Sequence, residues 1–134
     1  MSVSYISGAL RQLVAARADY RCEHCRLPET RMYYRGQIDH IISEKHGGPT
    51  REDNLAFCCL PCNRHKGSDI ASLAADGTVT RLFHPRQDRW ETRFFVVGLL
   101  IQARTPPAEA TIRLLQLNAA PRLAERELLP DAAA

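Results

Sequence analysis

The sequence predicts an α+β fold in a single domain, and three observations support this. The chain has 134 residues, a length typical of one domain, and 45% of them are hydrophobic, enough for one modest core. Segments with the apolar spacing of helices alternate with short segments of strand-like composition. Two C-x2-C pairs, Cys22/Cys25 and Cys59/Cys62, frame the first two expected strands. We therefore expect small strands and helices around a core that the cysteines link.

The first half of the chain contains the expected core of the domain, at about residues 20–75. An apolar pattern at helical spacing, a polar Gly- and Pro-rich stretch and a proline suited to the first turn of a helix mark its elements. We expect an N-terminal helix at 7–19 before the core, and within the core strands at 32–42 and 55–59, a loop at 43–53 between those strands, and a helix from about 61 to 73.

The second half is expected to form a supporting extension, at about residues 76–130. An Asp-Gly turn, a basic Trp-containing connection, an apolar run and a Thr-Pro-Pro helix start follow one another. We expect a strand at 78–83, a connection at 84–93, one buried strand at 94–102, a helix from 105 to about 118, and a last helix at about 121–129 before a frayed tail.

The composition limits the compartment and the partners. The longest apolar run, residues 94–101, is too short to cross a bilayer, so no membrane association is expected. The N-terminus lacks the pattern of a signal peptide, and we therefore expect a cytoplasmic protein. The net charge of +3 permits a polyanionic partner without demanding one. No heptad pattern is visible, which leaves a monomer and a weak dimer open.

The paired cysteines predict a structural zinc site. Thiols stay reduced in the cytoplasm, and an odd count of five cysteines does not suit a pure disulfide framework. Zinc takes four ligands tetrahedrally, and two residues between paired cysteines let both sulfurs reach one ion. The alternative is a set of unpaired buried thiols. The fifth cysteine, Cys58, is expected to face the opposite side of its strand from Cys59 and to pack in the core.

Further motifs lie within and after this frame. They are Asp39-His40-Ile41-Ile42, Gly47-Gly48, Asn54-Leu55, Cys59-x2-Cys62-Asn63-x2-Lys66-Gly67 and, later, Leu82-Phe83-His84-Pro85-Arg86-x-Asp88-x-Trp90. In order and spacing, residues 20–70 resemble an HNH endonuclease of the bacterial and phage type with two zinc knuckles. The later motif resembles the C-terminal half of such proteins more loosely. The resemblance implies a ββα-metal core, in which two antiparallel strands and a helix surround one divalent ion.

The resemblance implies a role for each motif residue. His40 is similar to the general base that activates water, a task that suits an imidazole titrating near neutral pH. Asp39 and Asn63 resemble the ligands of the catalytic cation, and their oxygen donors favour Mg²⁺ or Mn²⁺. Asn54 resembles the middle asparagine, which fixes the loop and orients His40. Many members carry histidine where this chain has Asn63. Phosphate contacts are expected from three residues at the helix start, Arg64, His65 and Lys66.

The implied function is metal-dependent hydrolysis of phosphodiester bonds in DNA. The main rival is a zinc-stapled nucleic-acid-binding module without catalysis, which the presence of both Asp39 and His40 disfavours. A purely structural zinc domain would explain the cysteines but not the Asp-His-Asn series. Residues 81–104 hold five arginines, which either widen a DNA-binding surface or form an ordinary solvated face. The sequence leaves open the preferred substrate, DNA or RNA, and nicking or double-strand cleavage.

Overall fold

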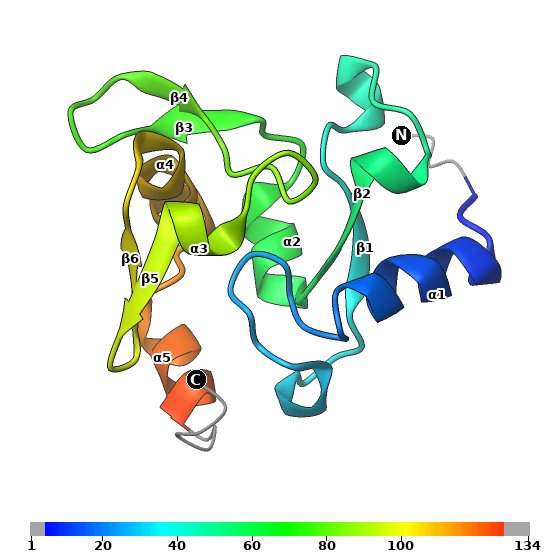
Figure 1. Cartoon of the computed structure of the whole chain (residues 1–134), viewed down its shortest axis with the longest axis horizontal. Helices are drawn as coiled ribbons and strands as arrows, with labels where there is room; N and C mark the ends of the chain where they lie inside the picture. Colours follow the sequence, from blue (N-terminus) through cyan, green and yellow to red (C-terminus); the bar gives the residue numbers. More distant parts are fainter. Residues whose placement is uncertain (1–4, 128–134) are drawn as a thin grey trace.

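The α+β class predicted from the sequence is confirmed. The computed structural model describes residues 5–127, and in that part of the chain three separate two-stranded antiparallel sheets combine with five α-helices and short 3-10 turns (Figure 1). None of these helices has the length and apolar character needed to cross a bilayer.

The first half places two strands beside two helices. Helix α1, Gly8–Arg17, begins where the Ser7 hydroxyl accepts a hydrogen bond from the Leu10 N–H at 3.1 Å, and it buries Val14 and Ala15. Strands β1 (Gln37–His40) and β2 (Leu55–Cys58) pair antiparallel, with Asp39 opposite Ala56 and His40 opposite Leu55. Helix α2, Leu60–Lys66, follows β2 after one residue, with Pro61 in its first turn. The strand, loop, strand and helix order agrees with the sequence prediction.

Two expectations in this half are wrong in extent. The strand expected at 32–42 is limited to β1, because a 3-10 turn at Glu29–Arg31 and a bond from the Gly36 N–H to Glu29 Oε2 (2.9 Å) hold the preceding residues in a loop. The helix expected to reach residue 73 ends at Lys66, because Gly67 adopts φ +53. Residues Ala71–Leu73 instead form β3, which pairs with β4, Val79–Arg81.

The second half forms a further hairpin and three helices. Trp90–Arg93 forms a short helix, α3, at the end of the expected connection. The single buried strand expected at 94–102 is two strands, β5 (Phe94–Val97) and β6 (Leu100–Ala103), because Gly98 turns the chain at φ +61. Val96, Val97 and Leu100 in this hairpin are exposed rather than buried. Helix α4, Pro106–Leu115, has the proline start that the sequence predicts, and Gln116 ends it in a left-handed conformation.

Helix α5 spans Ala120–Glu127, and the expected continuation to residue 129 and the frayed tail lie outside the described residues. The two halves share one hydrophobic cluster. It joins the four paired cysteines to Phe83, Phe94, Ile101, Leu115 and Leu117 from the extension. Helix α2 lies between the β1–β2 sheet and helix α4, with contacts to both (Figure 1). The cysteines therefore occupy the junction between the core and the extension.

Candidate active site and zinc centre

The four paired cysteines converge on one point. The sulfur atoms of Cys22, Cys25, Cys59 and Cys62 all lie within 4.8 Å of one another, and all four side chains are buried. The Cys25 N–H donates to Cys22 Sγ at 3.4 Å, which closes the first knuckle. Four buried thiols at such separations form the donor set that structural zinc takes. The cluster is thus consistent with the zinc site predicted from the spacing.

The fifth cysteine stands apart from this cluster. Cys58 is free and fully buried, and it does not belong to the group of four convergent sulfurs. Burial raises the pKa of Cys58 well above the ordinary thiol value, with the nearby Asp39 carboxylate as the next cause. Its protonated thiol packs in the core, as expected from its position on the strand.

Asp39 lies on β1 and meets a residue of α2. Its side chain is 6% exposed, and its Oδ2 lies 3.0 Å from the ammonium of Lys66, which is 3% exposed. Lys66 Nζ also donates to the carbonyl oxygen of His40 at 3.0 Å. Burial raises the pKa of Asp39, and the charge and hydrogen bond of Lys66 offset only part of that rise. Lys66 was expected at a DNA phosphate, but it lies inside the protein as the counter-ion of Asp39.

His40 follows Asp39 directly and is half-buried. Its Nε2 forms a hydrogen bond of 2.9 Å with the hydroxyl of Thr50, which lies in the loop between β1 and β2. Thr50 was not predicted from the sequence, because no local signal marks a threonine ten residues away as the partner of this ring.

Asn54 closes the loop that contains Thr50. Its side-chain amide donates to the carbonyl oxygens of Ile42 (2.8 Å) and Pro49 (2.9 Å), and its Oδ1 accepts from the Ile42 N–H (2.9 Å). A Cβ atom on Gly48 would lie 1.7 Å from the Ile42 carbonyl oxygen, so only glycine fits there. The bonds of Asn54 thus reach loop backbone, while the His40 ring is held by Thr50.

The remaining predicted residues lie on α2. Asn63 is partly buried and precedes Lys66 by three residues, so the two share a helix face. Arg64 and His65 are exposed, and they line a pocket of about 340 Å³ with Tyr33 and Tyr34. These tyrosines are 91% and 65% exposed, and the sequence analysis did not single them out.

Asp39 has one feature expected of a ligand for a hard cation. Asp39 Oδ2 is buried and, despite its ion pair, has no hydrogen-bond partner in the described part of the chain. A carboxylate oxygen with unused acceptor capacity and the amide oxygen of Asn63 are donors of the kind that Mg²⁺ takes, with water or substrate completing the shell. Within residues 5–127 only the cysteine cluster brings three or more His, Cys, Asp or Glu side chains together. Any cation at Asp39 would therefore have few protein ligands.

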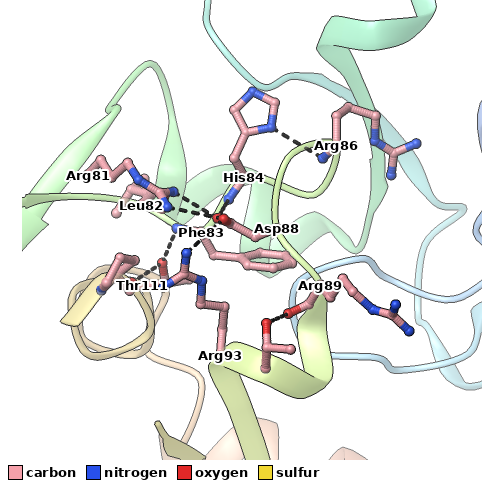
Figure 2. Close-up of polar contacts among 11 residues, drawn as sticks. Arg81, Leu82, Phe83, His84, Arg86, Asp88, Arg89, Arg93 and Thr111 are labelled. Carbon is pink, nitrogen blue, oxygen red and sulfur yellow. Dashed lines mark hydrogen bonds and ion pairs between the residues drawn. The ribbon is translucent and has the colours of Figure 1, made fainter. Parts of the chain in front are cut away.

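The later motif forms a structural loop against this core. The Asp88 carboxylate accepts hydrogen bonds from Arg81 (2.7 and 3.1 Å), Arg93 (3.1 Å) and the His84 N–H (2.9 Å), and Figure 2 shows the His84 ring pointing away from it. Arg86 pairs with Glu23, whose other carboxylate oxygen accepts the Phe57 N–H of β2 at 2.8 Å. Arg104 donates to the carbonyl oxygens of Glu91 (3.1 Å) and Phe94 (3.3 Å), so four of the five arginines at 81–104 connect parts of the fold.

The comparisons with known proteins agree with this architecture. Residues 22–69 match the HNH endonuclease family. No curated protein and no solved structure matches the chain. The matched segment contains β1, β2, α2 and all four convergent cysteines. The chain therefore contains an HNH endonuclease domain at residues 22–69, with a buried four-cysteine cluster consistent with its zinc knuckles.

Proposed function

We propose that this protein is a metal-dependent endonuclease that hydrolyses phosphodiester bonds in DNA. Members of the HNH family are typically phosphodiester hydrolases, and a nucleic-acid substrate follows from the family. The observation that carries the proposal is that Asp39 and His40 are consecutive residues at the end of β1. Both contact Lys66 of α2, and all three residues lie in the segment that matches the family.

The hydrogen bond to Thr50 supports a general-base role for His40. When His40 Nε2–H donates to the Thr50 hydroxyl, Nδ1 keeps its lone pair and can accept a proton. In this proposal Nδ1 takes the proton of the water that attacks phosphorus. Thr50 then holds the imidazole in this tautomer and orientation, as a positioning residue.

Asp39 and Asn63 are the proposed ligands of a catalytic Mg²⁺ or Mn²⁺ ion. When bound, such an ion stabilises negative charge on the phosphate and on the leaving 3′ oxygen. Lys66 holds the buried Asp39 carboxylate in place and lowers the cost of its charge. A cation at Asp39 Oδ2 would displace the Lys66 ammonium from that oxygen, where it lies at 3.0 Å.

Exposed groups along α2 support binding of nucleic acid. Arg64 and His65 are proposed phosphate contacts, and the neighbouring Tyr33 and Tyr34 offer ring faces to bases. A second cavity, of about 240 Å³, lies beside Lys66 and is also lined by Arg81 and His84. Its described lining residues include no acid, which suits an anionic substrate. Because both halves share one core, we propose that the chain acts as a single domain.

Cleavage of supercoiled plasmid by the zinc-loaded protein, with and without added Mg²⁺ or Mn²⁺, tests the proposal. His40→Ala should lower the cleavage rate by about 10²–10⁴-fold, because a general base typically contributes that much. His46→Ala is the matched control, since His46 lies on the exposed part of the loop, where its ring bonds to the Ser68 carbonyl oxygen. Equal cleavage by both variants would remove His40 from the mechanism. DNA binding without cleavage by the wild type would favour the rival, a non-catalytic binding module.

A further inference from the structure

A buried arginine of the last helix reaches the cysteine cluster. Arg122, on α5, is 5% exposed, and one of its terminal nitrogens lies 2.8 Å from Cys62 Sγ and 3.7 Å from Cys59 Sγ. Its other terminal nitrogen donates to the Leu115 carbonyl oxygen at 2.8 Å. The guanidinium is thus oriented by backbone from the extension and directed at sulfur atoms of the core.

The charge of the cluster explains why this contact is favourable. Four thiolates around one divalent cation carry a net charge of −2, and this cluster lies within a hydrophobic core. A buried charge is costly unless an opposite charge or hydrogen bonds compensate it. Guanidinium N–H groups that donate to thiolate sulfur supply both, and such outer contacts orient metal ligands and tune the metal.

We propose that Arg122 is an outer component of the zinc centre and that the extension supplies it from α5. Because the arginine and the cysteines belong to different halves of the chain, zinc binding and the docking of α5 stabilise each other. The arginine acts through Cys59 and Cys62 as a positioning residue and does not ligate the ion. This proposal does not depend on the nuclease function.

A second buried arginine on the same helix provides a matched control. Arg126 is 9% exposed and lies one helical turn after Arg122. Its terminal nitrogens donate to oxygens, namely the carbonyl oxygens of Leu99 and Leu117 and Oδ1 of Asn118. Loss of Arg126 should therefore loosen α5 without removing a donor from sulfur.

The test uses the full chain with Arg122→Gln, Arg122→Lys and Arg126→Gln. Zinc affinity is measured by competition with a chromogenic chelator, and the sulfur-to-metal charge-transfer band is recorded after cobalt substitution. Arg122→Gln should weaken zinc binding by about 10–100-fold, the usual effect of removing an outer-shell partner. It should also shift the band to lower energy, because thiolates without a donor hold their electrons less tightly. Arg122→Lys should fall between wild type and Arg122→Gln, since an ammonium cannot reproduce the guanidinium fork.

The control separates a role at the metal from a role in packing. Arg126→Gln should lower the thermal stability but leave the cobalt band in place. An unmoved band in Arg122→Gln, or an equal shift in Arg126→Gln, would overturn the proposal. If Arg122→Gln fails to fold, Arg122→Lys decides the question: a shifted band supports the proposal, and a wild-type band together with wild-type zinc affinity refutes it.

Discussion

The ion pair between Lys66 and Asp39 allows a quantitative test of how the site holds charge. Lys66→Met keeps most of the side-chain stem and removes the ammonium. Both side chains are almost fully buried, at 3% and 6% exposure, so water cannot replace the lost partner. Removing one partner of a buried ion pair costs about 3–5 kcal/mol. We expect Lys66→Met to lower the free energy of unfolding by about 3 kcal/mol. Lys45→Met removes an exposed lysine and should change it by less than about 0.5 kcal/mol.

The same perturbation has a predictable pH dependence. Burial raises the pKa of Asp39, and the loss of Lys66 should raise it further, since Lys66 acts to lower it. A carboxyl group whose pKa is higher in the folded state favours folding while it is protonated and opposes folding once it ionises. The destabilisation by Lys66→Met should therefore be small at mildly acidic pH and grow as the pH rises through the folded-state pKa. The double variant Asp39→Asn/Lys66→Met should lack this dependence.

Urea denaturation of the zinc-loaded variants, followed by the fluorescence of Trp90, measures both effects. Unfolding free energies are compared at about pH 5.5 and about pH 8, a range in which a shifted carboxyl can titrate. If Lys66→Met is as stable as Lys45→Met, or if its deficit is the same at both pH values, Asp39 is not held as a buried charge by Lys66.

Three further predictions follow from other contacts. Although burial raises it, hydrogen bonds from Arg81, the His84 N–H and Arg93 bring the pKa of Asp88 down to about 2, so Asp88→Asn should cost about 1–2 kcal/mol in thermal denaturation at neutral pH. Gly48→Ala should abolish most plasmid cleavage, because its Cβ would lie 1.7 Å from the Ile42 carbonyl oxygen, whereas Gly8→Ala, with open space around it, should leave cleavage unchanged. Asn63→His adds a nitrogen ligand, and cleavage after chelation should then be restored better by Ni²⁺ or Co²⁺ than by Mg²⁺; an unchanged metal preference would argue against Asn63 as a ligand.

The cysteine cluster could be predicted because each C-x2-C pair is recognisable within a short segment of the sequence. Two C-x2-C pairs each bring two sulfurs together, and few alternatives to a shared ion suit four thiols in one chain. The order of strand, loop, strand and helix was predictable for a similar reason, since apolar composition and Pro61 mark those elements. The motif roles of Asp39, His40, Asn54 and Asn63 remain predictions that the experiments above address.

Two of the errors in element extent arose where one glycine outweighs the composition around it. Gly67 ends α2 within a stretch expected to be helical, and Gly98 folds one apolar run into two strands. A glycine with positive φ reverses the chain at little cost, and composition averaged over a segment does not register it. Both positions were visible in the sequence as candidate breaks.

The distant partners of Lys66 and Arg122 could not be predicted from the sequence. Lys66 meets Asp39 across 27 residues, and Arg122 meets Cys62 across 60. Such pairs exist only after the sheet and helices have packed, and a lysine or arginine has the same local signature whether it faces solvent or a buried anion. The expectation of Lys66 at a phosphate was reasonable for a basic residue at a helix, and its tertiary environment overrode it.

The three backbone bonds of Asn54 have a consequence for substrate binding. One side chain spans the loop between β1 and β2 and holds Ile42 and Pro49 at fixed positions, so the loop is already ordered in the free protein. A flexible loop would lose conformational entropy whenever a substrate docked, and that loss would weaken binding. Here that entropy is lost only once, when the protein folds. Thr50 belongs to the same ordered loop, so its hydroxyl already contacts the His40 ring. The proposed base is thus already oriented before a substrate binds.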